Sequence, residues 1–463
     1  MNEKIDIKRR EFISKIGKTA LIGAPLLNFS SKLFAFTPKY EVGEKWGRQA
    51  GNWIYSCCNM CGGQSGIVAH VIDGIVRKIE PNPYNPNNIS CHPDDYFQNM
   101  GKAGVASICA KGNAGIMTLY DPDRIKKPLK RTNPKKGFDI DPGWVEISWE
   151  QALSEITDYL SKLRNAGEAH KLLWISEDHS FTHIQADFCK LYGTPNYYMH
   201  SNLCDTSRKA AAKWVFGHDR PLNDFFNTRY IMLWGWNPLE AMKWIYLPRM
   251  INEAIERGAK LTVVDPVMSV TAMKAHRYLQ IKPGTDGALA LAIANVIIKE
   301  NLYDKKFIEK WTVGFDKFSD YVQDKTPEWA QKITTIPAKT IYETAIELAT
   351  TKPATVDVWS GLQYPHGDYA AVAVFLLNAL IGTFDKPGGL CIPIKKGNKH
   401  IEVKAPKLEK KEVVEREKFP FYHKSGVYGK IFGDIASGKG PYDIKALMCI
   451  FQNPVMAVPN GIS

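Results

Sequence analysis

Beyond about residue 148 the chain alternates between segments with a helical period and short apolar runs. Apolar residues three and four positions apart predict amphipathic helices. Such helices are expected in WEQALSEITDYLSKLRNAG (149–167), LPRMINEAIERGA (247–259) and DGALALAIANVIIKENL (286–302). The first of them closes on Gly167, a residue that commonly ends a helix.

Between these helices lie short apolar runs that end in Gly, Pro or Asp turns, a pattern typical of strands. They are KLLWISE (171–177), RYIMLWGWNP (229–238) and KLTVVDP (260–266). Regular alternation of strand and helix predicts an α/β fold with a parallel sheet. Ligands of such sheets bind at the carboxyl ends of the strands, so WGWNP and VVDP are expected at a binding edge.

The part of the chain before about residue 123 differs in composition and in its pattern of apolar residues. Residues 46–122 are rich in cysteine and in loop-forming residues, and IVAHVIDGIVRKIE (67–80) alternates around Asp73-Gly74, which predicts a β-hairpin. Residues 123–463 carry the α/β pattern. Within them, 391–445 are rich in Lys, Gly and Pro and show little periodicity, so we expect a long surface excursion there.

Residues 1–35 have the features of an export signal. Arg9 and Arg10 form a twin-arginine pair, an apolar run follows at about 19–29, and a small residue, Ala35, comes next. The run is shorter than the roughly 20 residues that cross a bilayer. A twin-arginine signal is typical of the Tat route, which predicts a periplasmic protein that folds and takes up its cofactor before export.

The composition of the chain is that of a globular protein with a large core and says little more about its function. The chain has 463 residues, 44% of them hydrophobic and 23% charged, and a formal net charge of +12. The basic residues gather near the N-terminus and at about 395–418 rather than along one face, and no nucleic-acid-binding motif is present. We therefore expect no nucleic-acid partner.

The nine cysteines are unevenly distributed. Five of them lie within one 53-residue window: Cys57, Cys58, Cys61, Cys91 and Cys109. Clustered cysteines in odd number suit a metal site better than a disulfide framework. Zinc sites usually contain a second C-x2-C or paired histidines, whereas three thiolates from one region and one from a distance also suit a [4Fe–4S] cluster. Cys189, Cys391 and Cys449 stand alone and are expected to be buried.

Several motifs together resemble the catalytic subunits of molybdopterin oxidoreductases of the dimethyl sulfoxide reductase family. The matching pieces, in chain order, are the twin-arginine leader, C-x2-C, CAKGNAGI, LYDPDRIKKPLKR, ISWEQAL, WGWNPLEA, VVDP, KPGTDGALALA and GTFDKPGGL. The likeness is greatest to the polysulfide, thiosulfate, tetrathionate and arsenate reductase group. It implies a small iron–sulfur domain with β-hairpins over 46–122, parallel α/β molybdopterin-binding domains over 123–463, and the absence of the family's β-barrel-like C-terminal domain.

The resemblance implies one [4Fe–4S] cluster held by Cys58, Cys61 and Cys109. The family's loop has a further cysteine where this chain has Ser65, so the fourth ligand is expected to be Ser65, Cys91 or Cys57. The lysine after the last cluster cysteine lies between cluster and pterin in the resembling proteins. Lys111 occupies that position.

The resemblance also implies that Cys204 binds the molybdenum. It lies in YYMHSNLCDTSRKAAAKWVFG, where the family has a loop between a strand and a helix. A thiolate binds a high-valent metal strongly. His179, His200 and Arg208 lie near Cys204 in sequence and are candidates for binding an oxyanion, because such side chains make charge-assisted hydrogen bonds.

Two pterin guanine dinucleotides need hydrogen-bond partners and close approach to the backbone. The residues that the resemblance assigns to them are Gly235, Asn237, Glu240, Asp265, Gly284, Thr285 and Asp286. Thr285 and Asp286 precede a predicted helix, where N–H groups suit a phosphate. Where the family often has DPR, this chain has Asp265-Pro266-Val267, so one cation is missing. GxGxxG is absent, and a nicotinamide enzyme is not indicated.

These features predict the catalytic subunit, or its N-terminal part, of a Tat-exported molybdenum or tungsten reductase acting on polysulfide or thiosulfate. Tetrathionate or arsenate is the alternative substrate. Expected partners are a ferredoxin-like iron–sulfur subunit, a membrane anchor subunit, a Tat chaperone and a small inorganic substrate. Relatives usually exceed 700 residues, so the chain looks truncated. An inactive remnant that binds only a partner subunit, and a zinc-binding structural protein, are the other hypotheses.

Overall fold

A computed structural model describes residues 52–88, 95–102, 105–177, 181–200, 204–394, 403–408, 410–414 and 428–457. The expected export signal, Cys91 and His179 lie outside these residues. Among the described helices, none has the length and apolar character to cross a membrane.

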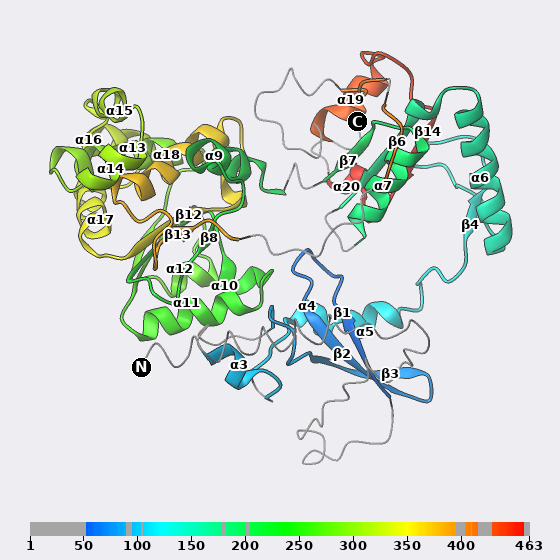
Figure 1. Cartoon of the computed structure of the whole chain (residues 1–463), viewed down its shortest axis with the longest axis horizontal. Coiled ribbons are helices and arrows are strands. Elements are labelled where there is room, and N and C mark those ends of the chain that lie inside the picture. Colours follow the sequence, from blue (N-terminus) through cyan, green and yellow to red (C-terminus); the bar gives the residue numbers. More distant parts are fainter. Residues whose placement is uncertain are drawn as a thin grey trace, which may run out of the picture. The chain divides into compact units, whose positions relative to one another are not determined.

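The cysteine-rich region begins with a three-stranded antiparallel sheet in the order β1-β2-β3 (Figure 1). Its strands are β1 (Asn52–Cys57), β2 (Gly66–Ile72) and β3 (Ile75–Pro81). The predicted hairpin at 67–80 is confirmed. Asp73 and Gly74 both take positive φ angles, 49° and 75°, as a tight two-residue hairpin turn requires. Three short helices follow: α3 (Tyr96–Asn99), α4 (Ala110–Asn113) and α5 (Gly115–Leu119).

The main sheet confirms the predicted parallel α/β fold. All its strand pairs are parallel, in the order β11-β10-β9-β12. The strands are β9 (Tyr230–Trp234), β10 (Lys260–Val264), β11 (Arg277–Leu279) and β12 (Ala354–Val358). Helices cover both faces, so β9 and β12 are buried along their whole length, as is typical of parallel sheets. The residues of β9 are all apolar, whereas β12 also contains the buried Thr355 and Asp357.

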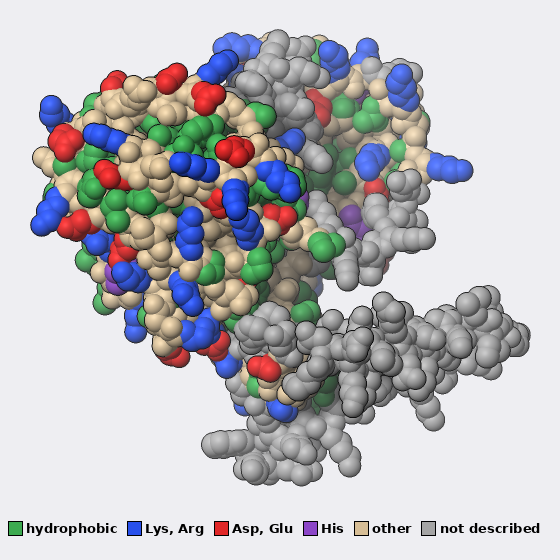
Figure 2. Space-filling model, turned by 60° about the vertical axis from the view of Figure 1, so that its left-hand side comes forward, with side chains coloured by type: hydrophobic (Ala, Val, Ile, Leu, Met, Phe, Trp, Pro, Cys, Tyr) green, Lys and Arg blue, Asp and Glu red, His purple; other side chains and the backbone are tan. Residues whose placement is uncertain are grey.

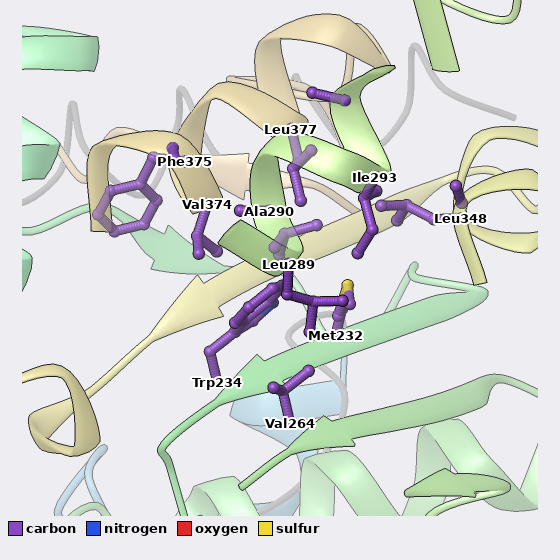
Figure 3. Close-up of a cluster of buried hydrophobic side chains, with 14 of the residues drawn as sticks. Met232, Trp234, Val264, Leu289, Ala290, Ile293, Leu348, Val374, Phe375 and Leu377 are labelled. Atoms are coloured by element: carbon purple, nitrogen blue, oxygen red, sulfur yellow. The ribbon is translucent and has the colours of Figure 1, made fainter. Parts of the chain in front are cut away.

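One face of this sheet packs against four helices. They are α9 (Thr206–Phe216), α13 (Asp286–Lys299), α17 (Ala338–Thr350) and α18 (Gly367–Leu380). Figure 3 shows Met232 and Trp234 of β9 beneath Leu289 and Ile293 of α13, all of them buried. Each such side chain contributes about 1.5–3 kcal/mol to folding through its removal from water.

The other face of the main sheet packs against α11 (Tyr246–Glu256), through Leu247, Met250 and Ile251. Short helices α10 (Pro238–Ala241) and α12 (Val270–Met273) follow β9 and β10. Three further helices lie on the α13 side: α14 (Lys305–Trp311), α15 (Phe315–Val322) and α16 (Pro327–Thr334). The small elements that remain in this part are β8 (Leu222–Asn223), η4 (Ser360–Leu362) and β13 (Leu390–Cys391), with β13 antiparallel to β8.

A second parallel sheet joins distant parts of the sequence in the order β14-β6-β7. Its strands are β6 (Leu172–Ser176), β7 (Tyr197–Met199) and β14 (Ala446–Cys449). The elements around it are α6 (Trp149–Asn165), η3 (Ala169–Lys171), α7 (Thr182–Tyr192), α19 (Tyr428–Ala436) and α20 (Pro454–Ala457). An antiparallel pair, β4 (Leu129–Arg131) and β5 (Trp144–Glu146), precedes α6.

The structure differs from the expected surface excursion over 391–445. Val413 and Val414 are almost fully buried, and Tyr428 and Ile431 are completely buried against β6 and β7. Part of this segment therefore belongs to a core. Its Lys-rich composition concealed the few apolar residues that pack there, because they have no regular period.

Candidate functional site

The loop after β1 carries two of the predicted cluster cysteines. Cys58 continues the β1–β2 pairing by one step, because its N–H donates to the Ser65 carbonyl at 2.8 Å. The Gly63 N–H donates to Cys61 Sγ at 3.4 Å. Cys109 stands at the N-terminus of α4. N–H groups directed at sulfur stabilise thiolates, the form in which cysteine binds metals.

Three thiols of this region lie near one another. Burial raises the pKa of Cys58, a hydrogen bond from the backbone of Met60 lowers it, and the neighbouring Cys61 and Cys109 raise it further. Gly112 of α4 lies beside Cys58, since a Cβ atom there would be in van der Waals contact with Cys58 Sγ at 3.4 Å. The structure therefore places Cys61 and Cys109 close enough to Cys58 to affect its pKa.

Cys57 is oriented differently. It is exposed, and its thiol donates to the Gln64 carbonyl at 3.3 Å. Within the described ranges, no three His, Cys, Asp or Glu side chains are grouped closely enough to hold a single metal ion.

The cysteine loop packs directly against the segment that follows β9. A Cβ atom on Gly63 would lie 1.8 Å from the Lys243 carbonyl oxygen, so only glycine permits this approach. Lys111 Nζ donates to the Ala241 carbonyl at 2.6 Å. Lys111 thus connects α4, which follows Cys109, with the end of α10.

Cys204 lines a cavity of about 240 Å³. It lies two residues before α9, and Trp236 and Trp359 reach the same cavity from the segments that follow β9 and β12. The position is therefore a carboxyl-end site, as parallel sheets provide. Burial raises the pKa of Cys204, and the nearby Lys243 lowers it.

The cavity wall carries more positive than negative side chains. The cationic ones are Arg208, Lys209, Arg220 and Lys243, and the acidic ones are Glu177 and Asp205. Figure 2 shows Lys and Arg side chains spread over one face of the molecule, so positive charge is not confined to this cavity. Lys209 is paired with Asp205. Lys243 lies over the Trp244 ring, 5.7 Å from its centroid.

The structure gives two of the oxyanion candidates definite partners. Arg208 is buried and donates to both oxygens of Asp357, at 2.9 and 2.8 Å. His200 Nδ1 lies 2.6 Å from Glu177 Oε2, beside the cavity. Lys209, Arg220 and Lys243 line the cavity but were not singled out from the sequence. The lysine at 243 lies far from Cys204 in sequence, so only the folded chain connects them.

The predicted cofactor residues after β9 form one connected group. Gly235 has φ 54°, and a Cβ atom there would lie 2.6 Å from Gly361 Cα, which explains the glycine. Asn237 accepts hydrogen bonds from the Thr271 N–H and hydroxyl, at 3.1 and 2.7 Å, and donates to Glu240 Oε2 at 2.6 Å. The amide and carboxylate are thus held in place at this edge.

Asp265 directly follows β10. Its Oδ1 accepts from the Val267 N–H at 2.9 Å, and burial raises its pKa. The Tyr278 hydroxyl, close enough for Asp265 to raise its pKa, is buried and makes no hydrogen bond with any described residue. A second cavity, of about 710 Å³, is lined by Pro266, Tyr278, Gln280, Lys282 and neighbouring residues.

The Gly284-Thr285-Asp286 segment leads into α13. Gly284 has φ 81° and open space around it, and Thr285 donates to the Lys282 carbonyl at 2.6 Å. Asp286 is buried and accepts from the Tyr364 hydroxyl at 2.8 Å, while burial raises its pKa. The hydrogen bond between Tyr364 and the buried Asp286 carboxylate therefore fixes the segment between β11 and α13.

Comparison with known proteins identifies the fold and the family. The model of the molybdopterin oxidoreductase family matches residues 124–425, which include Cys204, Gly235 and Asp265. The chain belongs to the molybdopterin oxidoreductase family. The cysteines at 58, 61 and 109 lie before the matched range.

Relatives of this family cover nearly all of the chain. It is 31% identical to the arsenate respiratory reductase molybdopterin-containing subunit of Chrysiogenes arsenatis, over 96% of this chain and 55% of that protein. It is 30% identical to the thiosulfate reductase molybdopterin-containing subunit of Salmonella typhimurium, over 87% of this chain and 52% of that protein. The chain thus spans about half the length of the curated relatives it matches. Acetylene hydratase from Pelobacter acetylenicus has a similar structure, with a TM-score of 0.70 and 25% identity over 88% of this chain and 58% of that one.

Proposed function

We propose that this chain is the catalytic subunit, or the N-terminal part of it, of an exported molybdenum-dependent respiratory reductase that acts on polysulfide or thiosulfate. The observation that carries the proposal is the placement of the Cys204 thiol in a cavity whose wall is richer in cations than in acids. A soft thiolate suits the metal, and the cations suit an anionic substrate.

The residues at the sheet edge fit a pterin guanine dinucleotide. The positive φ of Gly235 and its contact with Gly361 permit close backbone approach. The Tyr278 hydroxyl supplies a buried polar atom, and Asp265 supplies a half-buried carboxylate. In this proposal Cys204 holds molybdenum or tungsten, while Gly235, Asn237, Glu240, Asp265, Gly284, Thr285 and Asp286 hold the two dinucleotides. The bound metal would supply two-electron redox chemistry at an open coordination position.

Thiosulfate reduction takes up two electrons and one proton, breaks the S–S bond, and releases hydrosulfide and sulfite. In our proposal Lys243 and Arg220 bind the dianion at the cavity wall, since charge-assisted hydrogen bonds to oxyanions are strong. Glu177 also lines the cavity and is paired with His200 at 2.6 Å. This pair is suited to hold the proton that the leaving sulfur accepts.

Electrons would enter through a [4Fe–4S] cluster. The donor set of Cys58, Cys61 and Cys109 supports this, because Cys61 and Cys109 both affect the pKa of Cys58 and the sulfur of Cys61 accepts a backbone N–H bond. In this proposal Lys111, whose Nζ donates to the Ala241 carbonyl, holds a positive charge between the cluster and the pterin. A ferredoxin-like subunit with a membrane anchor would supply the electrons.

The substrate is tested with the chain purified anaerobically after expression with its own leader. We expect bound molybdenum and oxidation of reduced viologen by thiosulfate or polysulfide, and a Cys204→Ala variant should lose this activity. Lys213→Ala, an exposed helical change outside the cavity, is the control. A molybdenum-loaded chain that is inactive with thiosulfate and polysulfide would contradict the proposal.

Arsenate is the second candidate substrate. Two arsenate respiratory reductase subunits match 89% and 96% of this chain, and arsenate is an oxyanion that the same cations would bind. Viologen oxidation by arsenate alone, with no response to thiosulfate or polysulfide, would favour it. A chain that binds no molybdenum but captures a partner subunit would instead favour an inactive remnant.

Export is proposed from the twin arginines alone. Arg9→Lys together with Arg10→Lys should leave the protein in the cytoplasm, whereas Lys4→Arg should not. Cell fractionation after osmotic shock gives the answer, and a periplasmic double variant would contradict a Tat signal.

A further inference from the structure

Cys61 and Cys109 are both close enough to Cys58 to affect its pKa, but a [4Fe–4S] cluster is normally held by four protein ligands. We propose that the hydroxyl oxygen of Ser65 is the fourth ligand. The inference rests on the cluster proposed above and adds the identity of its remaining ligand.

Strand register places Ser65 beside Cys58. In the β1–β2 ladder Cys57 pairs with Gly66, and the next pair is therefore Cys58 with Ser65. The hydrogen bond from the Cys58 N–H to the Ser65 carbonyl, at 2.8 Å, confirms that step. Residues directly opposite one another in an antiparallel pair project from the same face, with Cβ atoms about 4.5–5.5 Å apart. Ser65 thus projects on the side of the cluster thiol Cys58.

The same strand register directs the Cys57 side chain to the face of the strand opposite to that of Cys58. Successive residues of a strand project from opposite faces, so Cys57 shares the face of Gly66 rather than that of Cys58. Over Gly66 this face is occupied by Asn85, since a Cβ atom on Gly66 would lie 2.6 Å from Asn85 Cβ. The Cys57 thiol instead donates to the Gln64 carbonyl. The Cys57 thiol lies near Cys58 but is directed at backbone carbonyls on the opposite face of the strand.

Binding of the Ser65 oxygen to the cluster needs no oxidant or reductant. An Fe–O bond forms, the hydroxyl proton passes to solvent, and the oxidation state of the iron does not change. An alkoxide is a harder ligand than a thiolate and stabilises oxidised iron. Cluster potentials respond to ligand type and charge, so this cluster should have a lower reduction potential than one with four thiolates.

The test compares four variants of the full chain, each purified anaerobically. They are Ser65→Ala, Ser65→Cys, Cys57→Ala and Cys91→Ala. Iron and sulfide per chain, electron paramagnetic resonance of oxidised and reduced samples, and the midpoint potential are measured. Circular dichroism and thermal unfolding check that each variant folds.

The wild type should hold about four irons. Ser65→Ala should lose one of them and give the paramagnetic signal of an oxidised three-iron cluster. Ser65→Cys should keep all four and shift the midpoint potential upward. Cys57→Ala and Cys91→Ala should match the wild type in iron content and potential.

Two results would overturn the inference while leaving the cluster in place. One is a four-iron wild type whose iron content, spectrum and potential do not respond to Ser65→Ala. The other is loss of an iron in Cys57→Ala or Cys91→Ala, which would assign the fourth ligand to that cysteine. A wild type with three irons would also reject Ser65. A wild type without iron would reject the proposed cluster itself, and the fourth ligand with it.

Discussion

Arg208 and Asp357 form a buried, bidentate ion pair, with Nε and Nη2 donating to the two carboxylate oxygens at 2.9 and 2.8 Å. Asp357 is the fourth residue of β12, and Arg208 lies in the first turn of α9, four residues after Cys204. Arg208 also lies over the Trp359 ring, 4.9 Å from its centroid. The pair therefore fixes the start of α9, and with it Cys204, against the carboxyl edge of the main sheet.

Removal of one member of this pair should destabilise the fold strongly. Asp357→Asn leaves the guanidinium without its counter-charge in the core, and breaking a buried pair costs about 3–5 kcal/mol. Denaturation by urea, followed by tryptophan fluorescence, measures the loss. Glu146→Gln breaks the Lys127–Glu146 pair, 2.9 Å long and largely exposed, and should hardly change the urea midpoint, because exposed ion pairs contribute little to stability. Equal effects of the two changes would contradict the structural role of Arg208.

Gly63 should be indispensable for the position of the cysteine loop. Gly63→Ala places a Cβ atom 1.8 Å from the Lys243 carbonyl oxygen, so the loop must move away and the N–H bond to Cys61 Sγ is lost. We expect faster alkylation of Cys61 in the metal-free chain and less iron after anaerobic reconstitution. Mass spectrometry of labelled peptides follows the first effect.

Gly433→Ala is the matched control for Gly63→Ala. Gly433 lies within α19 and has no atom near the position of a Cβ, so alanine there should be neutral or stabilise the helix by up to about 1 kcal/mol. If both variants label Cys61 at the wild-type rate, the close packing of the loop is not needed.

The local elements of this chain could be predicted because their signals are local. The helix at 149–165 and the strand at 260–264 follow directly from apolar spacing and turn residues. The pairing of β14 with β6 could not, because Ala446 and Leu172 are brought together only by the fold between them. A parallel pair has no turn that would reveal its register.

The candidate site also combines residues that the sequence could indicate with residues that only the fold brings together. Spacing and resemblance singled out Cys204, Cys58, Cys61 and Cys109 as predicted ligands. Lys243 and Trp359 reach the Cys204 cavity from other segments, and no sequence pattern connects them to it. Single cysteines were also poorly predicted: Cys189 is buried as expected, but Cys449 is exposed at the end of β14. Its burial depends on what covers an edge strand, which the local sequence does not specify.

Lys243 should contribute to binding of an anionic substrate. Lys243→Met removes a positive charge from the cavity wall while keeping the apolar stem, and we expect KM for thiosulfate to rise roughly tenfold or more, since a hydrogen bond to a charged group contributes about 1.5–3 kcal/mol. Added salt should raise the KM of the wild type more than that of the variant.

Lys310→Met is the control for Lys243→Met. Lys310 lies over the Trp311 ring at 5.1 Å, much as Lys243 lies over Trp244, but it belongs to α14 and does not line the cavity. An unchanged KM in both variants would remove Lys243 from substrate binding.

Glu168 should make the second sheet sensitive to acid. Hydrogen bonds from Lys171 and Lys445, both at 2.6 Å, lower the pKa of Glu168 to about 2. Lys445 lies just before β14, so this carboxylate connects η3 with the distant strand that completes the sheet. Because the folded pKa lies below the unfolded value of about 4.5, the stabilisation is complete above about pH 5 and is lost as the pH falls toward 2.

Glu168→Gln should therefore lower the urea midpoint at pH 7, and the difference from the wild type should shrink between about pH 5 and pH 2. Lys445→Met should show the same trend with a smaller amplitude, because Lys171 still holds the carboxylate. Lys439→Met removes an equal charge between α19 and β14 and should leave the pH dependence unchanged. If the difference in urea midpoint between Glu168→Gln and the wild type stays constant over this pH range, the ion pairs of Glu168 do not hold β14 in place.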